Sequence, residues 1–208
     1  FDGKLGKEVA TLIEKHSVKH LGFFEAGMRH VTNAVRPINT PEDLVGLKLR
    51  TPNAKYHLTS VERMGASPTP MAFGELYAAM EQKVVDGQEN PLSNIHAAAF
   101  YEVNDHLALT GHLHLTHMVM YSEGLWKGLS PEHQVIIKQA VLDSQQVQRD
   151  KVAADDASLL SVLEDKGMQV TRPDRVALAA KVAPLREQAI EEFGEQSAKW
   201  IKLIDDVR

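Results

Sequence analysis

The sequence predicts an α/β protein of two lobes, and three observations lead to that prediction. Extended segments and helices alternate in short order through the first half of the chain, which is typical of a largely parallel sheet covered by helices. The second half holds one long helix that nothing interrupts between Pro131 and Gly167. At about 1.5 Å per residue this helix would run roughly 50 Å, more than the ~30 Å width of a small domain. It is therefore expected to cross from one lobe to the other, with a ligand-binding cleft between the lobes.

Hydrophobic spacing and turn residues define the elements of the first half. Apolar residues three and four apart predict helices, whereas runs of β-branched and aromatic residues predict strands. Thr40-Pro41 is expected to begin a short helix, and Asn53 and Gly65 are expected to cap and to end another. In chain order the sequence predicts a helix over 4–15, strands over 18–26 and 47–51, a helix over 54–64, an extended segment over 67–71, a helix over 73–83, a strand over 84–89 and a helix over 91–100.

The second half begins with an extended, apolar-rich region over 105–122. Ser130 and Pro131 then place a capping residue and a proline where a long helix begins. A short strand is expected over 167–171. Residues 174–208 are predicted to be helical, with a break at Phe193-Gly194.

Composition excludes several classes of function. The chain has 208 residues, of which 43% are hydrophobic and 25% charged, as in ordinary globular proteins. A net charge of −5 without a basic run argues against nucleic-acid binding, and no apolar stretch approaches the length of a membrane span. Cysteine is absent, which excludes disulfides and thiolate catalysis, and there is no phosphate-binding glycine loop. A start at Phe1 without initiator Met or leader is expected for a processed or truncated chain.

Several short motifs follow one another in a fixed order along the chain. They are Gly27-Met28-Arg29, Arg36 to Ile38, Thr40 to Leu44, Gly46 to Arg50, Phe73 to Ala79, Val85 to Asn90 and Trp126 to Pro131. In this order and spacing they resemble the solute-binding receptors of tripartite ATP-independent periplasmic (TRAP) transporters, the DctP-like family. The resemblance covers nearly the whole chain.

This resemblance implies a type II-like periplasmic-binding-protein fold, in which hinge strands and a domain-spanning helix join two lobes. Lobe two is expected over 28–115 and 156–208, and the remaining part of lobe one over 1–27 and 116–155. Family members look longer at the N-terminus by about a hundred residues, so lobe one is expected to be incomplete and to expose part of its core. The resemblance also implies a periplasmic receptor that binds a small organic acid and delivers it to TRAP membrane subunits.

Two arginines are candidate ligand-binding residues. A guanidinium can hold a carboxylate through two parallel hydrogen bonds, and Arg50 lies at a strand end before a proline turn. The resemblance implies that Arg50 is the main carboxylate clamp; the alternative is a surface ion pair with Glu62 or Asp43. Arg29 matches a second, assisting basic position, and its alternative is a solvated turn residue.

Three further candidates each carry two interpretations. The amide of Asn90 can donate to the same carboxylate as Arg50, or Asn90 can cap the helix that Pro91 opens. Phe73 is expected either to line the cleft and pack on the carbon skeleton of the ligand or to belong to the core. Asn53 is expected to line the cleft as well as to cap its helix.

The histidines and acids of the middle region complete the site analysis. His112 and His114 would share one face of a strand, with His117 on the other; because no third zinc ligand has a compatible spacing, no metal site is expected. The resemblance implies that His112 lies close to the cleft and is hydrogen-bonded toward the arginines. Glu89, like the neighbouring acid Asp86, is expected to be solvated or to cap a helix.

The sequence is therefore interpreted as a receptor for a small carboxylate, with no catalytic residues and no cofactor. The main alternative is an α/β enzyme acting on an anionic small molecule, with Arg50 positioning the substrate and a histidine as acid or base. A third interpretation is the ligand-sensing lobe of a regulator, against which the long crossing helix and the lack of a DNA-binding segment count.

Overall fold

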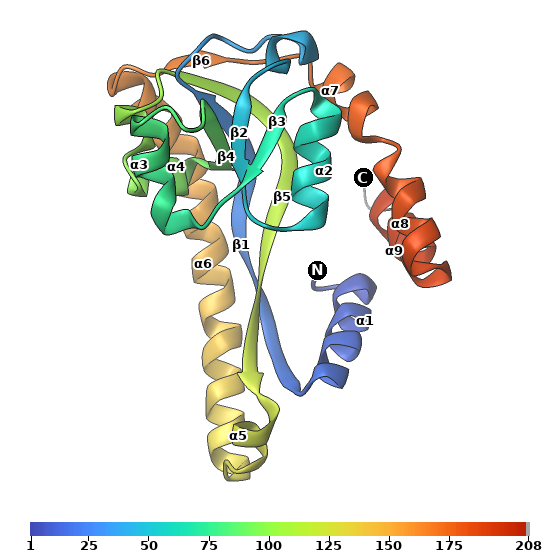
Figure 1. Cartoon of the computed structure of the whole chain (residues 1–208). Coiled ribbons are helices and arrows are strands. Elements are labelled where there is room, and N and C mark those ends of the chain that lie inside the picture. Colours follow the sequence, from blue (N-terminus) through green and yellow to red (C-terminus); the bar gives the residue numbers. More distant parts are fainter. Residues whose placement is uncertain (207–208) are drawn as a thin grey trace. The chain divides into compact units, whose positions relative to one another are not determined.

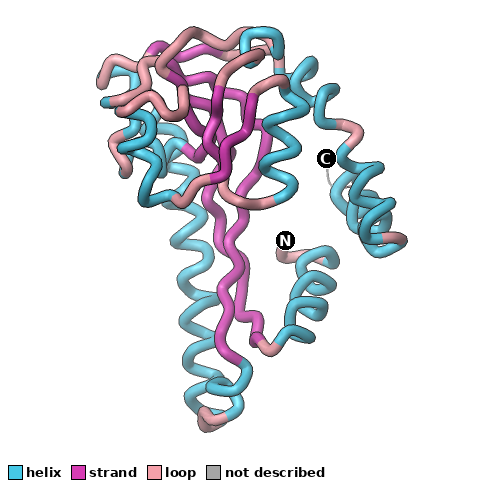
Figure 2. Tube along the Cα trace, in the orientation of Figure 1, coloured by secondary structure: helices cyan, strands magenta, loops and turns pink. Residues whose placement is uncertain are grey.

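The computed structural model describes residues 1–206, which form a six-stranded sheet and a set of helices (Figures 1 and 2). The strands are β1 (Val18–Asn33), β2 (Lys48–Thr51), β3 (Ser67–Pro70), β4 (Gly87–Pro91), β5 (His106–Ser122) and β6 (Gln169–Thr171). The α-helices are α1 (Lys4–Ile13), α2 (Lys55–Met64), α3 (Leu76–Glu81), α4 (Leu92–Ala97), α5 (Glu123–Lys127), α6 (Pro131–Asp165), α7 (Arg175–Val182), α8 (Leu185–Phe193) and α9 (Glu195–Asp205). Short 3-10 helices are η1 (Glu14–His16), η2 (Pro41–Leu44), η3 (Phe73–Glu75) and η4 (Phe100–Glu102). The predicted α/β class is confirmed.

The sheet is mixed, with the strand order β3-β2-β4-β1-β5-β6. β2 pairs in parallel with both β3 and β4, and β5 pairs in parallel with β6, whereas β1 runs antiparallel to β4. β1 is also longer than the predicted strand over 18–26. It continues to Asn33 because residues 29–33 pair with β4, and Gly27 takes up a φ of +88° within the strand.

The described chain divides into two compact units whose boundaries fall within β1, β5, α6 and α8. Unit 1 comprises residues 1–26, 116–154 and those from 189 onward, and unit 2 comprises 27–115 and 155–188. All of 156–208 was expected in lobe two, whereas the described residues from 189 onward group with unit 1. This segment groups with unit 1 because α9 packs against α1, where Glu8 accepts one hydrogen bond from Trp200 and forms an ion pair with Lys199. Residues 207–208 lie outside the described residues.

Unit 2 has hydrophobic cores on both faces of its sheet. The strands separate helices α2 and α7 from helices α3, α4 and the end of α6 (Figure 1). The first core consists of Val31, Ile38, Leu44, Leu47, Leu49, Val61, Met64, Ala66, Ala108 and Leu178. The second consists of Leu76, Ala79, Met80, Val85, Leu92, Ile95, Phe100, Leu107, Leu163 and Met168. Leu107 and Ala108 of β5 thus belong to the two opposite cores, because successive side chains of a strand point to opposite faces of the sheet.

Unit 1 joins the outer parts of β1 and β5 to the first part of α6. Gln148 of α6 contacts β1 twice, since its side-chain oxygen accepts from the backbone N–H of Glu25 and its side-chain nitrogen donates to the carbonyl of Glu25. Several large apolar side chains of this unit remain exposed, among them Met120 at 48% and Val147 at 70%. None of the described helices is apolar enough over a sufficient length to cross a bilayer.

Local capping signals account for several helix ends. Ser130 Oγ accepts the backbone N–H of His133 at the start of α6, which runs unbroken for 35 residues as predicted. Gly65 ends α2 in the left-handed conformation, and Gly194 separates α8 from α9. The expected capping role of Asn53 is wrong, because α2 begins one residue later and has Ala54 at its N-cap position.

Candidate functional site

Three neighbouring strands of unit 2 bring predicted site residues together. β4 lies between β1 and β2, and its register places Arg29 of β1 opposite Pro91 and Arg50 of β2 opposite Gln88. Asn90 of β4 therefore lies between the two arginines along the sheet. Because β2 and β4 are parallel, Arg50 and Asn90 both lie near the carboxyl ends of their strands, the usual position of a ligand site in an open α/β sheet.

Arg50 is buried, with 4% of its surface exposed, so the alternative of a surface ion pair is wrong. Its Nε donates to the carbonyl oxygen of Met71 over 2.9 Å, and its guanidinium carbon lies 5.9 Å from the ring centre of Phe73. No ion pair joins Arg50 to a carboxylate within residues 1–206. Burial lowers the pKa of Arg50, the nearby charge of Glu89 raises it and the charge of Arg29 lowers it again.

Arg29 is buried as well, but it carries a partner. Its Nε donates to Oε2 of Glu89, and its Nη2 donates to Oε1 of Glu89 over 2.9 Å and to the backbone carbonyl of the same residue. Arg29 is 3% exposed and Glu89 0% exposed. The alternative of a solvated turn is therefore wrong for Arg29, and the expected solvated or capping role is wrong for Glu89. The two side chains form a buried, two-pronged ion pair.

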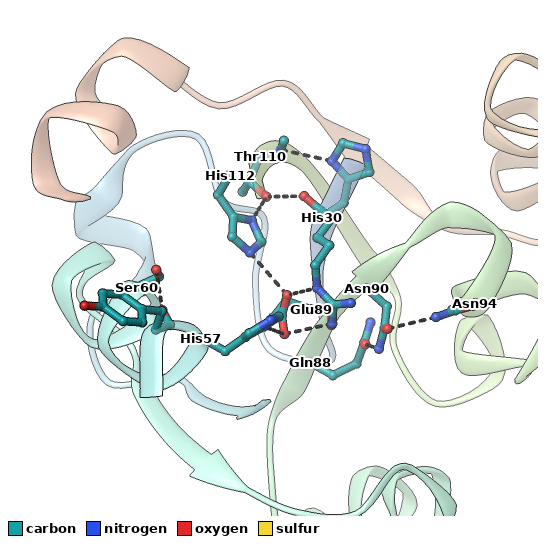
Figure 3. Close-up of polar contacts among 12 residues, drawn as sticks. His30, His57, Ser60, Gln88, Glu89, Asn90, Asn94, Thr110 and His112 are labelled. Atoms are coloured by element: carbon teal, nitrogen blue, oxygen red, sulfur yellow. Dashed lines mark hydrogen bonds and ion pairs between the residues drawn. The ribbon is translucent and has the colours of Figure 1, made fainter. Parts of the chain in front are cut away.

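Two histidines complete the surroundings of Glu89 (Figure 3). His57 Nδ1 of α2 lies 3.3 Å from Oε1, and His112 Nε2 of β5 lies 3.3 Å from Oε2. Because an ionised carboxylate only accepts, both ring nitrogens must donate, and Nδ1 of His112 faces the hydroxyl of Thr110 at 2.8 Å. His112 thus lies beside the Arg29–Glu89 pair, and its expected place close to a ligand remains a prediction.

The charge of Glu89 is strongly favoured by these contacts. Burial alone would raise the pKa of Glu89, but hydrogen bonds from His112, His57 and Arg29 and the charge of Arg29 outweigh burial and hold the pKa well below its usual range. Glu89 therefore stays ionised and neutralises Arg29. His30 behaves differently, since burial lowers its pKa to about 4 and its Nδ1 accepts the backbone N–H of Gly111.

Asn90 takes part in a polar network rather than in a helix cap. Helix α4 has Pro91 at its N-cap position, so the capping alternative for Asn90 is wrong. Its Nδ2 donates to Gln88 Oε1, and its Oδ1 accepts from Asn94 Nδ2 over 3.1 Å (Figure 3). Asn90 is buried, with 3% of its surface exposed. It belongs to β4, the strand between β1, which carries Arg29, and β2, which carries Arg50.

Phe73 and Asn53 both lie at the surface. Phe73 is 48% exposed, and its ring centre lies 5.7 Å from that of Phe100, so it borders the core without belonging to it. Asn53 is exposed in the turn between β2 and α2. Their expected contacts with a ligand remain predictions.

No metal site emerges from residues 1–206, in which no group of three His, Asp or Glu side chains is arranged to hold an ion. A cavity of about 360 Å³ lies in unit 1 between α1 and α9. It is lined by Lys4, Lys7, Glu8, Thr11, Leu12, Lys15, Gln196, Lys199 and Trp200. None of the six candidate ligand-binding residues contributes to it.

The sequence did not reveal the buried polar residues that hydrogen-bond to the candidate residues Arg29 and Asn90. Glu89 and Gln88 are fully buried although both are polar, and Thr32 of β1 is buried beside Gln88. One signal was available: Gln88, Glu89 and Asn90 form a run of three polar residues in a predicted strand. A polar side chain in a central strand is usually buried and needs hydrogen-bond partners there. Three such residues in a row therefore indicate a buried polar network.

The comparisons with known proteins agree with one another. Residues 1–192 match the family model of the bacterial extracellular solute-binding proteins, family 7 (DctP). The chain is 38% identical to the sialic acid-binding periplasmic protein SiaP of Vibrio cholerae, over 94% of this chain and 61% of that protein. It is 33% identical to the 2,3-diketo-L-gulonate-binding periplasmic protein YiaO of Escherichia coli, over 100% of this chain and 63% of that protein.

Solved structures give the same result. A TRAP periplasmic solute-binding protein from Chromohalobacter salexigens, with bound D-glucuronate, superposes with a TM-score of 0.95 at 28% identity over 100% of this chain and 69% of that chain. One from Polaromonas, bound to D-erythronate, gives 0.90 at 36% identity over 94% and 65%. The chain spans about three fifths of the length of the curated relatives named above.

Proposed function

The chain belongs to family 7 of the bacterial extracellular solute-binding proteins, and on that premise we propose that it binds a small organic acid for a TRAP transporter. The protein would bind the acid in the periplasm, through the carboxylate, and deliver it to the membrane subunits of the transporter. Relatives named for sialic acid and diketogulonate, and structures with glucuronate and erythronate, support a polar carboxylate as the ligand class.

One observation carries the proposal: Arg50 is a buried cation without a carboxylate partner among residues 1–206. Burying an unpaired charge is unfavourable, so proteins pair buried charges or reserve them for a ligand. Here the pairing acid is used elsewhere, since both oxygens of Glu89 are occupied by Arg29. A ligand carboxylate would supply the missing negative charge and accept two parallel hydrogen bonds from the guanidinium.

The other candidates take supporting roles in this proposal. Asn90 donates from its amide to the same carboxylate, and Arg29 adds its share of positive potential. Phe73 covers the carbon skeleton with its exposed ring. His112 and Asn53 border the ligand from β5 and from the turn before α2.

An enzyme acting on an anion would use the same arginine but needs a reactive group beside it. The acid nearest to Arg29 is held ionised by three donors, which suits a structural counter-ion better than a proton-transfer group. His112 is likewise engaged at both ring nitrogens. These contacts and the family favour the receptor over the enzyme.

The proposal is tested by titration calorimetry of the full-length protein with D-glucuronate, D-galacturonate, D-erythronate and succinate, with D-glucose as the neutral counterpart of glucuronate. We expect saturable binding of at least one acid, no heat with D-glucose, and recovery of the acid unchanged by mass spectrometry. Failure of all four acids to bind would argue against the proposed ligand class. Conversion of an acid during the incubation would favour the enzyme.

A further inference from the structure

We propose that Gln88, Thr32 and Asn104 form a buried chain of hydrogen bonds that orients the carboxamide of Asn90, so that it offers a donor rather than an acceptor to the ligand. The inference rests on the proposed function, because it assigns positioning residues to the same site. All three positioning residues are 0% exposed. None of them was singled out by the sequence.

The direction of the chain is set at Asn104, where α4 and η4 lead into β5. Its Nδ2 lies 2.7 Å from the backbone carbonyl oxygen of Val103 and 3.4 Å from that of Asp86. A carbonyl oxygen only accepts hydrogen bonds. The amide of Asn104 must therefore turn its NH₂ group toward these two carbonyls and its oxygen away from them.

From Asn104 each partner fixes the next one. Its Oδ1 can only accept, so the hydroxyl of Thr32 donates to it over 2.7 Å. That hydroxyl has one hydrogen, so its oxygen is left to accept from Gln88 Nε2 over 3.0 Å. The NH₂ group of Gln88 thereby faces β1, and its Oε1 faces Asn90.

The orientation of Asn90 follows from both of its neighbours (Figure 3). Its Nδ2 donates one hydrogen to Gln88 Oε1, and its Oδ1 accepts from Asn94 Nδ2 of α4. Rotating the amide by half a turn would set two oxygens against each other on one side and two NH₂ groups on the other. It would leave buried polar groups without partners, which is strongly unfavourable.

One N–H of Asn90 is left over by this arrangement. Arg50 pairs with Gln88 across β2 and β4, and Asn90 is two residues beyond Gln88, so all three side chains belong to the same face of the sheet. Donors of Arg50 and Asn90 are thus available on that face, and no acceptor of Asn90 competes with them. The buried chain prepares this arrangement before the ligand arrives, which lowers the ordering cost of binding.

The test breaks the chain at its hydroxyl link. Thr32→Val keeps the side-chain shape and removes both hydrogen bonds, and Thr32→Ser keeps the hydroxyl. Thr51→Val is the matched control, because Thr51 is also 0% exposed but its hydroxyl has no hydrogen-bond partner among the described residues. Two readouts are measured on the full-length protein: solvent exchange of the Asn90 side-chain amide protons by NMR without ligand, and the affinity for D-glucuronate, or for whichever acid of the panel above binds.

We expect Thr32→Val to accelerate exchange of the Asn90 amide and to weaken acid binding by about tenfold, as for one lost hydrogen bond. Thr32→Ser should restore both values, and Thr51→Val should change neither. Unchanged exchange or unchanged affinity in Thr32→Val would overturn the inference, as would an equal loss in Thr51→Val. If the parent protein binds none of the acids, the proposed function fails, and the exchange measurement alone decides whether the chain orients Asn90.

Discussion

The shape of the Arg50 guanidinium can be separated from its charge by two substitutions. Arg50→Lys keeps a cation but loses the planar pair of N–H groups, whereas Arg50→Met also removes the charge. Truncating one partner of a buried, hydrogen-bonded charge pair weakens binding by about 2–5 kcal/mol. With about 1.4 kcal/mol per tenfold change, we expect Arg50→Met to reduce acid affinity by roughly 30-fold to several thousandfold. Arg50→Lys should fall between Arg50→Met and the parent protein.

Arg50→Met should change the stability of the unliganded protein far less than it changes acid affinity, because it removes stabilising and destabilising contributions together. Arg50→Met removes the hydrogen bond to the Met71 carbonyl and the stacking on Phe73, worth about 1.5–3 and about 0.5–1 kcal/mol. It also relieves a buried cation that lacks a carboxylate partner among residues 1–206, a relief of similar size. We expect the free energy of unfolding to change by no more than about 1 kcal/mol, or about 2–4 °C in Tm.

Titration calorimetry and thermal unfolding of the unliganded protein measure these two quantities. Arg36→Met serves as the control, because Arg36 also donates to backbone carbonyls, those of Asp43 and Val45, but is no candidate for the site. It should leave acid affinity unchanged. The reasoning is refuted if Arg50→Met retains acid binding within about threefold of the parent protein, or if its affinity loss is matched by Arg36→Met.

Three further substitutions test the surroundings of the site. Glu89→Gln leaves a buried arginine without its counter-ion, so urea unfolding at pH 7 should show a free energy of unfolding lower by about 3–5 kcal/mol. Because the pKa of Glu89 is lowered, the stability that Glu89 contributes is complete above pH ~4.5 and declines below it. Below pH ~4.5 the variant should therefore lose less stability than the parent protein. Burial lowers the pKa of His30 to about 4, so the stability that neutral His30 contributes is complete above pH ~6.5 and is lost as the pH falls toward 4. His30→Gln should flatten the dependence of unfolding free energy on pH in this range by about 2 kcal/mol. An unchanged slope would contradict burial as the cause of the lowered pKa. Gly27→Ala should lower stability more than Gly46→Ala. Both glycines have positive φ, but only at Gly27 would the new Cβ meet a carboxylate oxygen of Asp156, at 2.9 Å. Equal decreases in Tm for the two variants would count against that contact.

Local signals in the sequence located most elements, because a helix end depends on a few neighbouring residues. Ser130-Pro131 at the start of α6 and Gly65 at the end of α2 are such signals, and both were interpreted correctly. Asn53 was misleading, because this common capping residue type stands one position before Ala54, the N-cap residue of α2. The extension of β1 beyond residue 26 could not be predicted, because its continuation depends on pairing with β4, which lies more than 50 residues further along the chain.

The candidate site could be predicted only in part, for the same physical reason. The resemblance selected residues that would face a ligand, and the sequence itself showed their types. Glu89, the partner of Arg29, is separated from it by 60 residues, and Thr32 is separated by 56 residues from Gln88, the partner of Asn90. Such contacts follow from strand order and register, which neither spacing nor composition determines.

The two arginines show why a partner matters more than a residue type. Arg50 was expected to be the main clamp and Arg29 an assisting residue, and both prove to be buried in strands next to β4. Arg29 lies against an ionised glutamate that satisfies its charge and holds its guanidinium in place. Arg50 has only a carbonyl and an aromatic ring as its described contacts, so its charge remains to be balanced. In the proposed site a ligand carboxylate would therefore gain most from Arg50, while Arg29 with its fixed counter-ion would contribute less.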